Sequence, residues 1–389
     1  MTQMPKAKAA ILIATLSAAN FAIGMGAFVV IGVLTPISEG LGMTKQEAGF
    51  VLTSYAIAYA ILSPLLVAMT GTWSRRNVLL IGMGLFGLGA ALTALASDTT
   101  LLYAARVVAA AGSGMFTPVA ASVAFSVSAP EDRGKALSNV FFGLTLAQAL
   151  GVPAGAWIGY TFGWQAAFIV VALLAAASVA LCTALVPKAV AFQVNSLKTL
   201  GEALADWRSM LSVLYTATFL GAIYILFTYF APLLEAKQGF DRNGVSLFLL
   251  MLGLGAVNGN FLGGRLNDRL GSARTLMILC VGQMVMLSLF SFLPMPVVFL
   301  AIMGFVWSSF GWSFMAAQQT RLVLQTPERQ SVVLALNAAA IYVGASLGSF
   351  IGGQVLKVWG LDALGVAAAA TMVLAFGHLV ASERVKRQS

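Results

Sequence analysis

The sequence contains few charged residues for its length. Only 9% of its 389 residues are Asp, Glu, Lys or Arg, whereas 60% are hydrophobic. A soluble domain carries about 25% charged residues because its surface faces water. This chain has too few polar groups to cover itself, so we expect most of its outer surface to contact the lipid bilayer.

Histidine and cysteine are also scarce, which excludes several kinds of site. The chain has one histidine and two cysteines. Cys182 and Cys280 both lie inside apolar runs, so neither a disulfide framework nor a Cys/His metal site is predicted. A membrane-embedded enzyme would need clustered His, Asp, Glu, Ser or Cys in its spans. The spans lack such a cluster and the chain lacks a Walker-type loop, so we expect no enzymatic activity and no cofactor.

Long apolar runs take up most of the chain. About 20 apolar residues are needed to cross the hydrocarbon core of a membrane. Uncharged stretches of that size run over residues 9–38, 48–74, 77–97, 107–130, 136–187, 209–234, 243–264, 275–320, 330–356 and 363–382. Two of them have double length and are predicted to break at tight turns, at Gly163-Trp164 and at Pro294 to Pro296. The sequence therefore predicts an all-α membrane protein with twelve transmembrane helices.

The basic residues predict the orientation of these helices. A net charge of +9 often indicates a nucleic-acid partner, but here the basic residues lie between the apolar runs. One side of the predicted membrane holds Lys6, Lys8, Arg75, Arg76, Arg133, Lys135, Lys188, Lys198, Arg208, Arg265, Arg269, Arg274, Arg321, Arg329, Arg384, Lys386 and Arg387. The other side holds only Lys45, Lys237, Arg242 and Lys357. The positive-inside rule then places both termini in the cytoplasm, and no nucleic-acid partner is expected.

The chain divides into two related halves. The most polar stretch between spans predicts a cytoplasmic linker over residues 188–207, between an N-terminal six-helix half (1–187) and a C-terminal six-helix half (208–389). Gly151 and Gly155 match Gly348 and Gly352 at one common offset, and Pro130 matches Pro327 at the same offset. A parallel six-helix repeat with the substrate near the midplane between the halves is a recurrent transporter design. A non-transporting receptor or scaffold is disfavoured, because no sizeable soluble domain is seen.

Several motifs resemble those of the major facilitator superfamily. The segment Gly264-Arg265-Leu266-Asn267-Asp268-Arg269-Leu270-Gly271 resembles the loop signature G-x-L-x-D-R-x-G of that family. The equivalent loop of the first half keeps Arg75 and Arg76 and lacks the aspartate. Arg106 resembles the arginine of the family's fourth helix. The resemblance covers nearly the whole chain and implies the two-half fold of the family.

The fifth span is similar to that of drug and metabolite exporters in this superfamily. The resemblance rests on Gly151-Val152-Pro153-Ala154-Gly155, followed by Gly163-Trp164. Tyr229 to Pro232, Trp312-Ser313 and Asn337 before Gly344 are most similar to purine base and nucleoside efflux pumps, then to chloramphenicol and sugar exporters. This resemblance implies a monomer in the bacterial inner membrane that exports small organic molecules by alternating access.

Charged and glycine residues in these motifs suggest roles in conformational change. Asp268, beside Arg269, is suited to pair with an arginine or cap a helix and so latch one conformation; the alternative is a solvated charge cluster. A charge inside a membrane is expensive, so Arg106 is predicted to be functional unless its side chain snorkels to the interface. Gly151 and Gly155 allow close helix packing and Pro153 favours a kink, which suits structural packing and a moving interface alike.

Polar and aromatic residues inside the spans are the candidate substrate contacts. They are Asn20, Gln148, Tyr224, Asn258, Trp312, Asn337 and Tyr342. Amides pair with the edges of a heterocycle and aromatic rings stack on its face, so the set predicts a neutral, flat, polar substrate. The alternative for each residue is an interhelical hydrogen bond.

One feature of proton-driven exporters is absent from the first span. Such exporters often have an acidic residue in its middle, where this chain reads Gly24-Met25-Gly26-Ala27-Phe28. Proton antiport normally needs a titrating group in the membrane. Coupling through Asp98 near Arg106, coupling through the substrate's own protonation, and no coupling all stay open. An importer or facilitator of a neutral solute is the alternative function.

Overall fold

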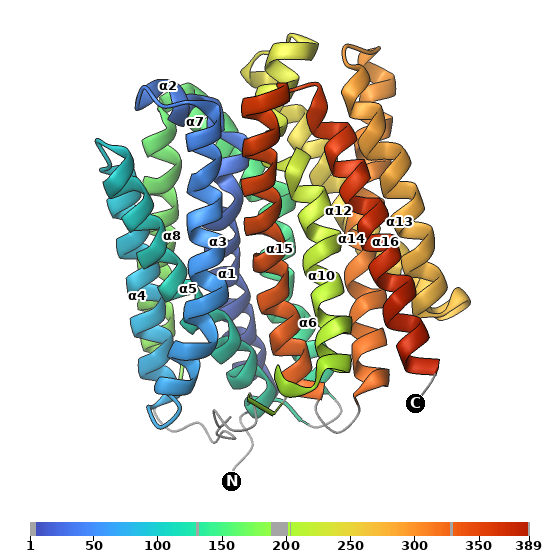
Figure 1. The fold of residues 1–389 in the computed structure, drawn as a ribbon. Coiled ribbons are helices and arrows are strands. Elements are labelled where there is room, and N and C mark those ends of the chain that lie inside the picture. The colour runs from blue at the N-terminus through green and yellow to red at the C-terminus, as the bar shows by residue number, and fades with distance from the viewer. Residues whose placement is uncertain (1–4, 130–131, 188–200, 203, 327–329, 388–389) are drawn as a thin grey trace.

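The computed structural model describes residues 5–129, 132–187, 201–202, 204–326 and 330–387. In this part of the chain, twelve helices are long and apolar enough to cross a membrane. They stand side by side in one bundle, and α1 (Lys6–Gly32) begins on the face where α16 (Ala363–Arg387) ends (Figure 1). We call that face the terminal face and the opposite one the distal face. The prediction of twelve spans is confirmed.

Six spans form each half of the bundle. The N-half consists of α1, α2 (Leu34–Gly40), α3 (Lys45–Met69), α4 (Arg75–Ala94), α5 (Thr99–Val127), α6 (Arg133–Leu146), the π-helix η2 (Ala147–Gly151), α7 (Val152–Phe162) and α8 (Trp164–Leu185). The C-half consists of α10 (Trp207–Phe227), α11 (Phe230–Leu233), the π-helix η3 (Leu234–Gln238), α12 (Arg242–Leu270), α13 (Ser272–Leu289), the 3-10 turn η4 (Phe290–Phe292), α14 (Val297–Gln325), α15 (Gln330–Trp359) and α16. Most of the predicted linker, residues 188–200 and 203, lies outside the described residues.

The helix ends follow local sequence signals. Gly163 adopts φ 89° and separates α7 from α8, so the break predicted there is confirmed. The second predicted break is confirmed too, because α14 begins directly after Pro296. Asp98 and Asp241 cap α5 and α12 by accepting hydrogen bonds from the backbone N–H groups of Leu101 and Gly244.

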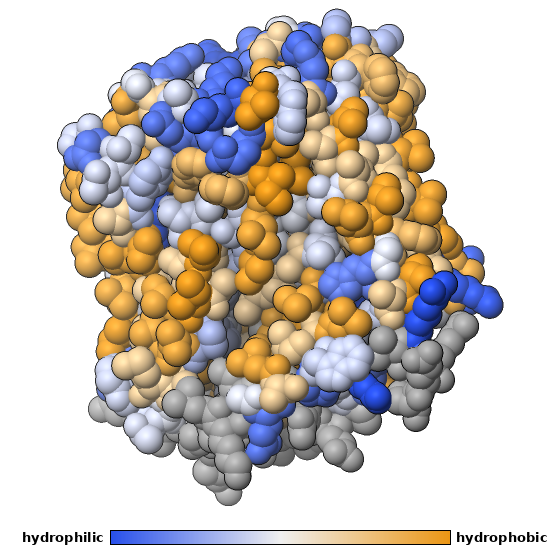
Figure 2. Space-filling model, in the orientation of Figure 1, coloured by the Kyte–Doolittle hydropathy of each residue, from blue (hydrophilic) through white to orange (hydrophobic). Residues whose placement is uncertain are grey.

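The surface of the bundle is apolar around its middle. Many large hydrophobic side chains away from the helix ends are exposed, among them Ile61, Leu173, Val285 and Leu374. Figure 2 shows apolar side chains over the middle of the visible face, with polar ones gathered toward the distal face. In water such a surface would be unfavourable, whereas in a bilayer it contacts lipid.

Glycines spaced four residues apart form a stripe along one helix in each half, and these glycine stripes let helices pack closely together. A Cβ atom added at Gly155 would lie 2.3 Å from Val29 Cγ2, so this glycine lets α7 approach α1 closely. In the C-half, a Cβ at Gly348 would lie 2.3 Å from the carbonyl oxygen of Gly221 on α10. Both stripes therefore contact helices of their own half, which supports the packing interpretation of Gly151 and Gly155.

The fifth span is irregular at the point where the two halves meet. The π-helix Ala147–Gly151 ends two residues before Pro153, which has no N–H to bond to the carbonyl of Ala149, four residues earlier. A Cβ atom added at Gly253 of α12 would lie 2.3 Å from that carbonyl oxygen. Only a glycine lets α12 come so close, so the distorted part of the fifth span forms the contact with the C-half.

Candidate functional site

A small cavity of about 20 Å³, room for about one water molecule, lies between the two halves. Its walls come from α1, η2 and α7 of the N-half and from α10, α12 and α14 of the C-half. The lining residues are Phe28, Gln148, Val152, Phe227, Leu249, Leu252, Gly253, Ala256, Ser308 and Trp312. Small-molecule sites are likewise mostly apolar with a few polar groups, but they have volumes of about 300–1,000 Å³, so the halves would have to move apart to admit a substrate here.

Two of the predicted substrate contacts, Gln148 and Trp312, line this cavity from opposite halves. Gln148 belongs to the π-helix η2, and Trp312 belongs to α14. Neither the Gln148 amide nor the Trp312 indole N–H forms a hydrogen bond within the described part of the chain. By contrast, the Ser308 hydroxyl donates to the Leu252 carbonyl at 2.6 Å. Gln148 and Trp312 are therefore the polar groups of the lining that are available to a bound molecule.

The other predicted contacts lie outside the cavity lining. Asn20 is fully buried; its amide nitrogen donates to the Val140 carbonyl at 3.1 Å and its oxygen accepts from Thr117. Asn337 accepts a hydrogen bond from Thr216 at 2.5 Å, and Asn258 donates to Ser309 at 3.1 Å. These three asparagines bond between helices, which was the alternative role expected for them.

Of the two predicted aromatic contacts that remain, Tyr224 lies near the cavity and Tyr342 lies at the contact between the halves. Tyr224 is behind the lining, with its ring centroid 6.4 Å from that of Phe28 and 5.7 Å from that of Phe227. Tyr342 of α15 stacks on Tyr59 of α3 at 3.8 Å between centroids, and so joins the C-half to the N-half. Its ring is consequently engaged in a contact within the protein.

The Arg106 guanidinium is buried against the first span. It is 1% exposed and donates to the carbonyls of Gly26 at 2.8 Å and Ala27 at 3.2 Å. Its central carbon lies 4.4 Å from the centroid of the Tyr55 ring, a cation–π distance. The side chain does not snorkel to the interface, and it binds at the part of α1 where a carboxylate is absent. Carbonyl dipoles and an aromatic face here take the place of a negative charge.

Tyr55 connects Arg106 to the contact between the halves. Its ring lies 6.3 Å from that of Tyr342, and its hydroxyl is 2.7 Å from the Ser113 hydroxyl. Sequence reasoning missed Tyr55 and Tyr59, although their spacing of four residues places both on one face of the second span. That spacing was the available signal.

The residues of the two loop motifs differ in burial. Arg75 is 6% exposed and donates to the Gly71 carbonyl at 3.3 Å, and Arg76 donates to the Thr183 carbonyl of α8. Asp268 and Arg269 are exposed. The two ion pairs among the described residues, Lys237–Asp362 and Arg321–Glu383, include neither of them. The latch at Asp268 therefore stays a prediction.

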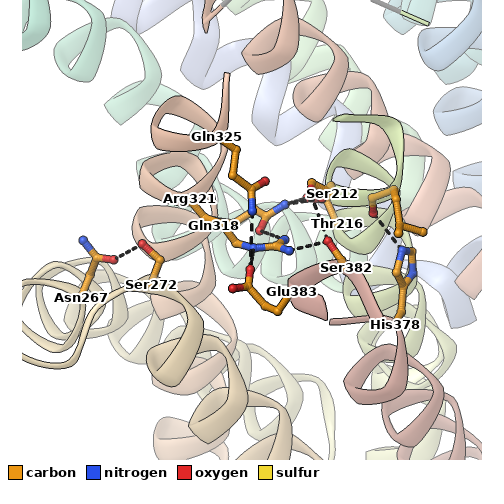
Figure 3. A network of polar contacts seen from close by, with 11 residues as sticks. Ser212, Thr216, Asn267, Ser272, Gln318, Arg321, Gln325, His378, Ser382 and Glu383 are labelled. Carbon is orange, nitrogen blue, oxygen red and sulfur yellow. Dashed lines mark hydrogen bonds and ion pairs between the residues drawn. The ribbon is translucent and has the colours of Figure 1, made fainter. Parts of the chain in front are cut away.

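A separate polar network lies inside the C-half (Figure 3). Arg321 was expected between spans, but it lies inside α14 and is 2% exposed. Its Nε donates to Glu383 Oε1 at 2.7 Å. Gln318 donates to the Ser212 carbonyl and to the Thr216 hydroxyl, and so ties α14 to α10. Nearby, His378 of α16 contacts the Leu211 carbonyl at 2.8 Å. These contacts hold α10, α14 and α16 together on the side of the bundle near the terminal face.

Comparisons with known proteins agree with this architecture. Residues 16–349 match the Major Facilitator Superfamily. The chain is 31% identical over 372 residues to YtbD, an uncharacterized MFS-type transporter of Bacillus subtilis, covering 93% of this chain and 92% of that protein. It is 29% identical to the inner membrane transport protein YdhP of Escherichia coli K12, covering 87% of this chain and 86% of that protein.

A solved structure has the same fold. A bacterial homolog of the human lysosomal transporter Spinster, in an inward-facing and occupied conformation, gives a TM-score of 0.79 at 17% identity and covers 98% of both chains. With its twelve spans, its cavity between two halves and the family match over most of its length, the chain belongs to the Major Facilitator Superfamily and is a membrane transporter rather than an enzyme.

Proposed function

We propose that this transporter exports small, neutral, planar organic molecules, such as purine-like metabolites or drugs, across the bacterial inner membrane. The observation that carries the proposal is the cavity between the halves, which Gln148 and Trp312 line from opposite sides. An amide and a ring suit the edge and the face of a heterocycle. The cavity of about 20 Å³ would have to widen as the halves move apart before such a molecule could enter.

Alternating access around this cavity is the mechanism we propose. The halves, with boundaries at 1–187 and 208–389, would rock about the contacts of α12 with η2 and of α3 with α15. The excess of basic residues at the terminal face supports a cytoplasmic location for that face. The distal face would then open to the outside, and the protein would act as a monomer.

Efflux from whole cells tests the substrate class. Cells that express the protein should retain less of a radiolabelled purine analogue than cells without it. Gln148→Ala and Trp312→Ala should each raise the concentration for half-maximal transport by about tenfold, since an unsatisfied polar contact costs about 1–3 kcal/mol. Gln319→Ala and Trp359→Ala are matched controls, because both side chains are exposed on the C-half. Unchanged retention across purine, chloramphenicol-like and sugar panels would refute the export proposal.

A facilitator of a neutral solute is the second candidate, favoured by a cavity lining in which none of the described residues is charged. Uptake into inverted vesicles separates the two functions. An exporter driven by protons accumulates the purine analogue above the outside concentration only when a pH gradient is imposed. A facilitator equilibrates the analogue at the same rate with and without that gradient.

A further inference from the structure

Two tyrosines from opposite halves stack on each other inside the protein. The rings of Tyr59 in α3 and Tyr342 in α15 lie 3.8 Å apart between centroids, with an angle of 26° between their planes. The residues are 4% and 7% exposed. Each ring covers one face of the other, so a separation of the two halves at this point uncovers two aromatic faces at once.

The contact between α3 and α15 is made by small groups on the distal side of this pair. The Ser349 hydroxyl donates to the Gly49 carbonyl at 3.0 Å, and the Ser346 hydroxyl donates to the Thr53 carbonyl at 3.4 Å. Small residues let two backbones approach more closely than a pair of rings does. Figure 1 shows α3 and α15 close together at the distal face and diverging toward the terminal face. The tyrosine pair lies on the diverging side of these contacts.

A further hydrogen bond joins the halves near the distal face. The Thr35 hydroxyl of α2 donates to Oε2 of Glu235 in η3 at 2.5 Å, so Glu235 bridges the C-half to the N-half. The halves are thus held together on the distal side of the tyrosines. The proposed function places the terminal face in the cytoplasm, and a molecule to be exported therefore reaches the tyrosines from the terminal side.

A third ring stands beside the pair and is anchored in the N-half. Tyr55 lies 6.4 Å from Tyr59 and 6.3 Å from Tyr342 between ring centroids. Its hydroxyl is 2.7 Å from the Ser113 hydroxyl, and the Arg106 guanidinium lies 4.4 Å from its ring centroid. These contacts keep Tyr55 in place when Tyr342 moves away. The positive charge of Arg106 disfavours a cationic molecule next to it, so the surroundings suit a neutral ring.

We propose that Tyr59 and Tyr342 form a second binding site, which takes a flat, neutral heterocycle between their rings when the halves move apart. The stacking contact that the rings lose with each other is replaced by two contacts with the molecule, one on each face. The ring centroids have to part from 3.8 Å to about twice that distance. The heterocycle class rests on the proposed function, but the site is separate, because neither tyrosine lines the cavity of Gln148 and Trp312.

Binding of tritiated adenine and tritiated nicotinamide to the purified full-length protein in nanodiscs tests the site. Tyr59→Leu and Tyr342→Leu each remove one aromatic face and should weaken binding on the order of tenfold, the usual contribution of one stacked base. Tyr59→Phe keeps the ring and should keep the affinity. Phe50→Leu is the matched control, because Phe50 and Phe350 form another stacked pair between α3 and α15, at 5.7 Å, and Phe350 is 47% exposed.

Photolabelling of the wild-type protein gives a second measurement, which does not depend on the folding of a variant. Light-activated 8-azidoadenine, mapped by peptide mass spectrometry, should label Tyr55, Tyr59 or Tyr342, and an excess of adenine should prevent this labelling.

Three results would overturn the second site: no binding of either compound to the wild type, equal weakening by Tyr59→Leu and Phe50→Leu, or a label confined to the surroundings of Trp312. The last of these leaves the export proposal standing. Conversely, labelled tyrosines in a protein that produces no efflux from cells count only against the export proposal.

Discussion

Removing the carboxylate of Glu383 should destabilise the C-half strongly. Arg321 and Glu383 form an ion pair of 2.7 Å whose side chains are 2% and 17% exposed. Breaking a buried pair by removing one partner costs about 3–5 kcal/mol, because the other charge remains buried and unpaired. Gln318 and Ser382 still bond to Arg321 in such a variant, so we expect the lower end for Glu383→Gln, about 3 kcal/mol.

The chain contains a matched control for this prediction. Lys237 and Asp362 lie 2.6 Å apart, almost the same distance, but their side chains are 32% and 60% exposed. Exposed pairs contribute about 0–1 kcal/mol, because water and salt screen the attraction and ordering both side chains costs entropy. Asp362→Asn should therefore change stability by less than about 1 kcal/mol. The comparison isolates burial, since the two distances agree.

Denaturant unfolding of the purified protein in detergent measures both variants. Arg321→Met combined with Glu383→Leu removes both charges, and should be more stable than either single variant, because no uncompensated charge is left. The reasoning is refuted if Glu383→Gln and Asp362→Asn cost the same, or if the costs of Arg321→Met and Glu383→Leu simply add.

The two glycine contacts give further predictions. Gly155→Ala should lower stability by about 1–3 kcal/mol, because its Cβ would meet Val29 inside the N-half; thermal unfolding checks this. Gly253→Ala should lower the transport rate more than the stability, because its Cβ meets the Ala149 carbonyl of the other half and the halves can separate to relieve the clash. Gly84→Ala in α4, with no atom within 4 Å of the added Cβ, is the control for both and should leave stability and transport unchanged.

The sequence alone was sufficient for the number of spans and for the two breaks inside the double-length runs. Runs of apolar residues fix which segments enter the membrane, because each polar group left in lipid is costly. Gly163 ends α7 and Pro296 precedes the first residue of α14, both through local backbone constraints, so both breaks could be read directly. The family followed from short motifs whose spacing does not depend on tertiary contacts.

Only the tertiary structure decided which polar residue faces the cavity. Gln148 and Asn20 are both amides inside spans, yet one lines the cavity and the other bonds to a carbonyl of α6. When a helix is apolar on most sides, its sequence does not show which side faces the cavity. The sequence therefore could not distinguish the role of Gln148 from that of Asn20. The structure also showed that Arg106 binds backbone carbonyls and that Glu235 bridges the halves. Such contacts join residues far apart in the chain, and only the packing of helices against one another brings them within bonding distance.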